Sequence, residues 1–69
     1  MQAQYAVTGM TCQHCVSHVT EEVSAIPGVD AVDVNLNGTM VVTSAGPISF
    51  DDIEEAVTEA GNYEVAPAA

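Results

Sequence analysis

The apolar positions of the chain follow two periods, one of about two residues and one of about 3.6, and these predict alternating strands and helices. Tyr5 and Val7 alternate with polar residues between residues 4 and 8, which predicts a first strand. Apolar residues then recur at helical spacing from about residue 14 to residue 25, which predicts a helix that Pro27-Gly28 ends. The expected buried stripe of that helix consists of Val16, Val19, Val23 and Ile26.

The second half of the chain predicts a hairpin between two further strands. Asn37-Gly38 is a strong hairpin signal because both residues tolerate a positive φ angle. It separates an alternating stretch that begins near Val32 from a third strand over residues 39–44. The side chains expected to face the interior from these two strands are Val32, Val34, Leu36, Met40 and Val42.

A second helix is predicted from its cap and from its apolar stripe. Ser49 is expected to be the N-cap, with Asp51 and Asp52 in the first turn, where the helix dipole favours carboxylates. Gly61 is expected to end the helix, and residues 63–66 predict a short last strand. The expected buried stripe consists of Phe50, Ile53, Val57 and Ala60.

The order strand, helix, strand, strand, helix, strand is that of a ferredoxin-like βαββαβ sandwich, which is an α+β fold. Four strands in this order can form one antiparallel sheet, and both amphipathic helices then cover one face of it. At 69 residues the chain has room for one core, so residues 1–69 are expected to form a single domain.

The charge of the chain is strongly one-sided, with ten acidic residues, no lysine, no arginine and a formal charge of −10. Nucleic acids and anionic membranes are bound through lysine and arginine, so neither is expected as a partner. No apolar run approaches the roughly 20 residues that cross a bilayer, and the first residues lack a signal-peptide pattern. The chain is therefore expected in the cytoplasm, without membrane insertion. The acidic residues are expected to keep it soluble, or to match a basic partner or a salt-rich cytoplasm.

The two cysteines of the chain, Cys12 and Cys15, lie three residues apart between the first predicted strand and the first predicted helix. Two thiols at this spacing can face one ion when the first lies in a loop and the second opens a helix. The partial positive charge of a helix N-terminus favours the thiolate, which is the form that binds metal. Thiolates select Cu(I) and Zn(II) over hard ions, so Cys12 and Cys15 are the predicted metal ligands.

The histidines decide whether this site is closed or open. A closed zinc site needs four protein ligands, and besides carboxylates the chain offers His14 and His18. At about 100° per residue, both histidines fall on the solvent side of the helix, whereas Cys15 falls at the edge of the buried stripe. They therefore do not close a tetrahedron with both sulfurs. The open two-sulfur site that remains suits Cu(I) best, with His14 as a candidate auxiliary ligand.

The run Gly9-Met10-Thr11-Cys12-x-x-Cys15 resembles the signature of the heavy-metal-associated domain family. That family includes small bacterial copper chaperones and the N-terminal domains of copper-pumping ATPases. Ile26-Pro27-Gly28-Val29 and Ala60-Gly61 extend the resemblance over nearly the whole chain.

The resemblance carries residue roles onto this sequence. It implies that Cys12 and Cys15 hold the ion and that Met10 packs into the core as an anchor. Tyr63 resembles the aromatic residue that lies near the metal in many bacterial members. Asn62 is a departure, because it lengthens the step that leads to Tyr63 by one residue.

The function implied by the resemblance is that of a copper chaperone and not of an enzyme. Such a protein binds Cu(I) and delivers it to the metal-binding domain of a copper-transporting P-type ATPase, with a copper-responsive regulator as a further candidate partner. Two alternatives stay open: a carrier or sensor module for Zn(II) or Hg(II), and a thiol-disulfide oxidoreductase. The second alternative is disfavoured because no tryptophan flanks the cysteine pair and no proline lies between the cysteines. The metal-free chain is expected to be a monomer. With copper, two molecules are expected to share the ion in a weak dimer that salt promotes, because repulsion between two bodies of charge −10 opposes it.

Overall fold

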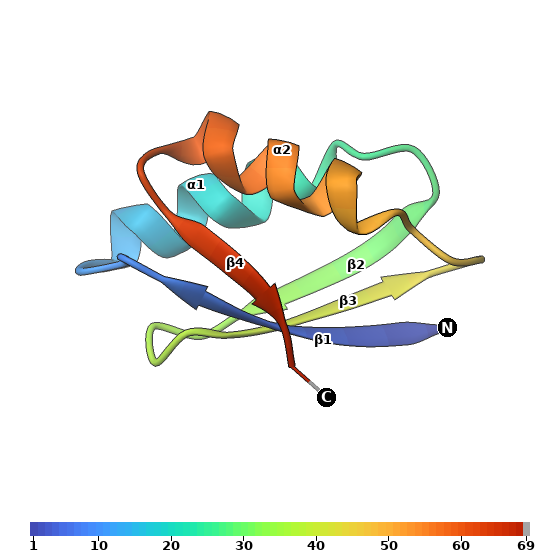
Figure 1. The fold of residues 1–69 in the computed structure, drawn as a ribbon, viewed down its shortest axis with the longest axis horizontal. Helices are drawn as coiled ribbons and strands as arrows, with labels where there is room; N and C mark the ends of the chain where they lie inside the picture. The colour runs from blue at the N-terminus through green and yellow to red at the C-terminus, as the bar shows by residue number, and fades with distance from the viewer. Residues whose placement is uncertain (69) are drawn as a thin grey trace.

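The computed structural model describes residues 1–68 and contains six elements in the predicted order. They are β1 (Gln2–Thr8), α1 (Gln13–Ser24), β2 (Val29–Val34), β3 (Thr39–Ser44), α2 (Phe50–Ala60) and β4 (Glu64–Pro67). The strands form one antiparallel sheet in the order β2-β3-β1-β4, and both helices lie on one face of it (Figure 1). The predicted ferredoxin-like sandwich is therefore confirmed. Neither described helix combines the length and the apolar character that crossing a bilayer requires.

The core lies between the helices and the two central strands, β1 and β3. Tyr5 of β1 pairs with Met40 of β3 in the antiparallel register, and both side chains are buried. Met40 and Val42 therefore face the interior as predicted. The ring of Tyr5 also stacks on that of Phe50 at the start of α2, with the ring centroids 6.1 Å apart. The other buried apolar residues are Val7, Val16, Val19, Val23, Ile53, Ala56 and Val57.

The hairpin between β2 and β3 differs from the prediction. β2 ends at Val34, and Leu36 is 49% exposed, so its predicted inward orientation is wrong. The amide of Gly38 donates to the carbonyl of Asn35 at 2.9 Å, which places Leu36 and Asn37 at the corners of a turn. Gly38 has a φ of +105°, whereas Asn37 does not have a positive φ. The loop is therefore a three-residue turn closed by a left-handed glycine, and Leu36 lies at its solvent-facing corner.

The beginning of α2 agrees with the prediction. The Ser49 hydroxyl accepts a hydrogen bond from the Asp51 amide at 3.2 Å, so Ser49 is the N-cap. Asp51 and Asp52 occupy the first turn, and the apolar stripe of the helix faces the core. At the other end, the amide of Gly61 donates to the carbonyl of Thr58 at 3.2 Å and closes the last turn.

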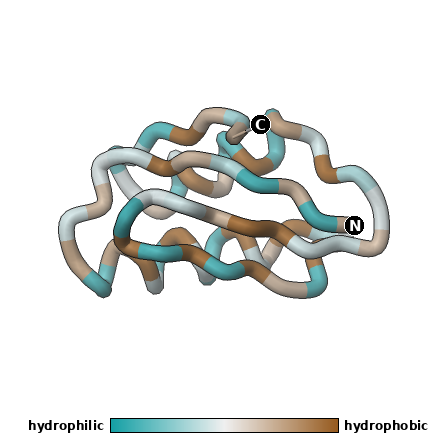
Figure 2. The backbone as a smooth tube through the Cα atoms, turned by 90° about the horizontal axis from the view of Figure 1, so that it is seen from below, coloured by the Kyte–Doolittle hydropathy of each residue, from teal (hydrophilic) through white to brown (hydrophobic). Residues whose placement is uncertain are grey.

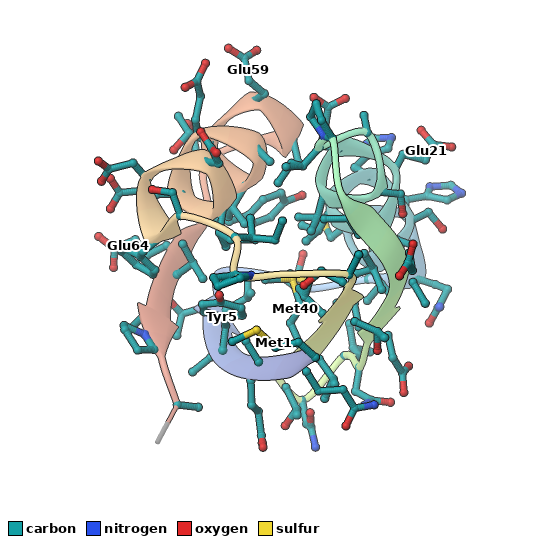
Figure 3. All side chains as sticks on the ribbon, turned by 90° about the vertical axis from the view of Figure 1, so that its right-hand side faces the viewer. Met1, Tyr5, Glu21, Met40, Glu59 and Glu64 are labelled. Carbon is teal, nitrogen blue, oxygen red and sulfur yellow. The ribbon has the colours of Figure 1, made fainter. Side chains whose placement is uncertain are left out.

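The acidic residues gather on the helical layer of the sandwich. Two of the ten lie in α1 and five in α2, and Figure 3 shows Glu21 and Glu59 projecting away from the sheet. Figure 2 shows the opposite face, where the strands are uncovered. The outward-facing residues of the two central strands are uncharged there, and they are Gln2, Gln4, Ala6, Thr8, Thr39, Val41 and Thr43. The helical layer therefore holds seven of the ten acidic residues, and the two central strands hold none.

Candidate metal centre

The predicted metal ligands lie at one end of the sandwich. The loop from β1 to α1 and the connection from α2 to β4 meet at this end, on the left of Figure 1. Their contact is close: a methyl group on Gly9 of the first loop would lie 3.2 Å from the carbonyl oxygen of Asn62 in the second. The two segments therefore frame the site jointly.

The start of α1 brings the two thiols together. Cys12 is the N-cap, with extended backbone angles (φ −154°, ψ 170°), and its carbonyl accepts a hydrogen bond from the amide of Cys15 at 3.0 Å. Cys15 therefore lies in the first helical turn. The two Sγ atoms are 3.5 Å apart, and both thiols are free. Cys12 is exposed and Cys15 is half-buried, so the site opens to solvent on the Cys12 side.

The thiol of Cys15 is unusually acidic. Its pKa is lowered from 9.0 to about 6, and the largest cause is the hydrogen bond from the Tyr63 side chain. The backbone at Thr11 and the thiol of Cys12 lower the pKa further, while burial acts in the opposite direction. The same hydrogen bond raises the pKa of Tyr63, because the phenol donates to the thiolate only while it keeps its proton. At neutral pH Cys15 is therefore mostly a thiolate.

Tyr63 reaches Cys15 despite the additional residue Asn62. The amide of Tyr63 donates to the carbonyl of Gly61 at 2.9 Å, so residues 61–63 form a tight three-residue turn. This turn takes up the additional length and directs the Tyr63 ring back toward the start of α1. Strand β4 begins at the next residue, where Glu64 pairs with Thr8 of β1. The sequence indicates Tyr63 as a residue near the metal but does not predict this turn. The signal that could have found the turn is a glycine two residues before an aromatic residue.

The remaining predicted site residues separate into two groups. Met10 is half-buried and packs against the core, which is the position expected of an anchor. His14 and His18 are both exposed on α1, as their helical spacing predicts. Across residues 1–68, no three histidine, cysteine or acidic side chains come close enough together to hold one ion. Among these described residues, the two sulfurs of Cys12 and Cys15 are the soft donor atoms that lie together.

The separation of the sulfurs suits one soft metal ion. With thiolate–metal bonds of roughly 2.3 Å, two sulfurs 3.5 Å apart subtend about 99° at the ion. That angle leaves room for a third ligand on the exposed side. A linear two-coordinate ion would need a separation of about 4.6 Å, so the sulfurs would have to open by about 1 Å. The exposed Cys12, at the end of a loop, is the sulfur that can make this movement.

Comparison with known proteins places the chain in a family. The model of the heavy-metal-associated domain matches residues 4–64. Copper chaperone CopZ of Bacillus subtilis is 43% identical over 67 residues, covering 94% of this chain and 96% of its own length. The COP-associated protein of Helicobacter felis is 41% identical over 66 residues, covering 94% and 98%.

Solved structures agree with this placement. A crystal structure of a copper-binding domain from HMA7, a P-type ATPase, has a TM-score of 0.87 and 30% identity, and the match covers 99% of this chain and 93% of that one. The chain belongs to the heavy-metal-associated domain family.

Proposed function

We propose that this chain is a copper chaperone, which carries one Cu(I) between Cys12 and Cys15 and passes it to the metal-binding domain of a copper-transporting P-type ATPase. One observation carries the proposal: two free thiols 3.5 Å apart at a helix N-terminus, the inner one acidic and the outer one exposed. The likeness to a copper chaperone over nearly its whole length supports the cargo. The likeness to a P-type ATPase domain supports the partner, because the two share one fold and can present their sites to each other.

Binding depends on the charge and softness of the two sulfurs. The lowered pKa of Cys15 supplies one thiolate at neutral pH, and metal binding releases the proton of the second thiol, Cys12. Two thiolates without further ligands favour Cu(I), which accepts low coordination, over Zn(II), which takes four ligands. The first turn of α1 contains no acidic residue, so no hard carboxylate ligand competes there.

Transfer follows from the open side of the site. An incoming thiolate of the partner bonds to the ion as a third ligand, next to exposed Cys12. Cys12 then leaves, a second partner thiolate bonds, and Cys15 leaves last. Each step replaces one copper–sulfur bond by another, so copper stays in the +1 state, and each departing thiolate can take the proton that a partner thiol released. A cytoplasmic location, where thiols stay reduced, belongs to the same proposal.

Anaerobic titration with Cu(I) against a chromophoric Cu(I) chelator tests the proposal. The wild type is expected to take up one Cu(I) per chain, and Cys12→Ser and Cys15→Ser are expected to lose tight binding. His18→Gln is the matched control, since His18 is exposed on the same helix, and it should bind as the wild type does. Undiminished affinity in Cys15→Ser would refute the site. Tighter binding of Zn(II) than of Cu(I) would refute the cargo, and disulfide-reductase turnover would favour a redox enzyme.

A further inference from the structure

The ring of Tyr63 lies against two glycines, one in each loop of the metal centre. A methyl group at Gly61 would lie 2.8 Å from Cε2, 3.2 Å from Cζ and 3.4 Å from the hydroxyl oxygen of Tyr63. A methyl group at Gly9 would lie 3.4 Å from Cδ1 of the same ring. The hydroxyl end of the ring therefore packs against Gly61, and the Cδ1 edge of the ring packs against Gly9.

The two contacts differ in how much space they leave. At 3.4 Å, the Tyr63 ring would be at the edge of ordinary van der Waals contact with a methyl group at Gly9, whose nearest atom is the Asn62 carbonyl oxygen at 3.2 Å. At 2.8 Å, the neighbour of a methyl group at Gly61 must move, and that neighbour is a rigid aromatic ring. The hydroxyl end of the ring cannot move away from Gly61 by itself. The hydrogen bond from the Tyr63 amide to the Gly61 carbonyl holds the backbone of Tyr63 next to the same residue.

We propose that Gly61 is a positioning residue of the metal centre: its lack of a side chain lets the Tyr63 ring lie across the backbone and present its hydroxyl to the sulfur of Cys15. The Tyr63 ring then also lies against Gly9 of the loop that carries the cysteines, and an incoming ligand approaches from the side of exposed Cys12. The consequence for metal transfer rests on the proposed function, whereas the contact between Gly61 and Tyr63 does not. A side chain at position 61 displaces the ring, and Cys15 loses its hydrogen-bond donor.

The metal-free protein tests the contact itself. We expect Gly61→Ala to shift the NMR resonances of the Tyr63 ring and to lower the urea midpoint of unfolding. In a Tyr63→Ala background the same substitution should lower the midpoint much less, because the ring is gone. An equal loss in both backgrounds would overturn the proposal, since it would trace the effect to the backbone, whose φ of +158° at Gly61 borders a region that side chains disfavour. Gly46→Ala is the control, because nothing lies within 4 Å of its new methyl group.

The copper-loaded protein tests the consequence. We expect a chelator to remove Cu(I) roughly tenfold faster from Gly61→Ala than from the wild type, which corresponds to about 1.4 kcal/mol. Tyr63→Phe should lose Cu(I) at a similar rate. The double variant that combines Gly61→Ala with Tyr63→Phe should be no faster than either single variant, and Gly46→Ala should match the wild type. Wild-type rates in Gly61→Ala, or additive effects in the double variant, would overturn the role of Gly61. Failure of the wild type to bind Cu(I) would instead refute the proposed function, and the metal-free measurements would still decide the contact.

Discussion

Glu55 is the position at which the one-sided charge of the chain should be easiest to measure. It is exposed in α2, with Asp51 four residues before it, Asp52 three before it and Glu59 four after it. Residues at these spacings are neighbours on a helix surface, and like charges there repel. Glu22 of α1 lines the same groove between the helices as three of these residues. The chain contains no lysine or arginine that could offset the repulsion.

The expected gain from Glu55→Gln follows from the three pairs within α2. Each like-charge pair destabilises a helix by about 0.2–0.5 kcal/mol, so removing three should raise the free energy of unfolding by about 0.6–1.5 kcal/mol at low salt. For a domain of this size, 1 kcal/mol shifts the melting temperature by about 4–8 °C. The melting temperature of Glu55→Gln should therefore rise by about 2–12 °C.

Glu54→Gln is the matched control for this substitution. Glu54 is also exposed in α2, but within helical reach it has one acidic neighbour, Asp51, because Val57 and Thr58 occupy the positions after it. Its expected gain is therefore about 0.2–0.5 kcal/mol. Thermal melts by circular dichroism in 10 mM and in 1 M NaCl would compare the two variants, since the Debye length falls from about 30 Å to about 3 Å over that range. Equal shifts in the two variants, or a gain for Glu55→Gln that survives 1 M NaCl, would refute the reasoning.

Three further predictions follow from the site and the fold. Tyr63→Phe removes the largest cause of the lowered Cys15 pKa, so the pH midpoint for alkylation of Cys15 should rise from about 6 toward 9.0. The stability of the metal-free wild type should rise between about pH 6 and pH 9.0, because the Cys15 thiol keeps its proton over that range in the unfolded chain but not in the folded one. Urea unfolding at several pH values measures this change, and a decline in stability would contradict it. Gly38→Ala should destabilise the hairpin by more than Gly46→Ala in the same unfolding assay, because its methyl group would lie 2.7 Å from the Val7 carbonyl oxygen.

The fold could be predicted from the sequence because its signals are local and agree with one another. The alternation around Tyr5 and the cap at Ser49 each specify an element without knowledge of the rest of the chain. Leu36 shows where such reasoning fails. The apolar alternation of β2 continues to Leu36, which lies beyond Val34, the last paired residue of the strand. The strand ends where the turn begins and not where the apolar pattern stops. The turn is set by Gly38, whose carbonyl accepts the Val7 amide at 2.7 Å, and that contact joins residues far apart in the sequence.

The candidate site also has one part that the sequence predicts and one part that depends on contacts between distant residues. The spacing of Cys12 and Cys15 shows on its own that two thiols can meet, because one helical turn brings them together. The contact of Tyr63 with Cys15 depends instead on a second loop, whose three-residue turn follows from a hydrogen bond between Gly61 and Tyr63. The sequence pattern contains the aromatic residue, but its position follows from tertiary structure.

The acidity of Cys15 shows why total charge is a poor guide to this site. A formal charge of −10 by itself would raise the pKa of a thiol, since every carboxylate disfavours a further anion. The pKa is lowered instead, and its causes are all close neighbours: Tyr63, Thr11 and Cys12. Seven of the ten carboxylates lie on the helical layer, and at physiological ionic strength charges are screened beyond about 8 Å. Hydrogen bonds from the two loops of the site therefore outweigh the net charge of the chain, and a strongly acidic protein can still hold a thiolate at Cys15.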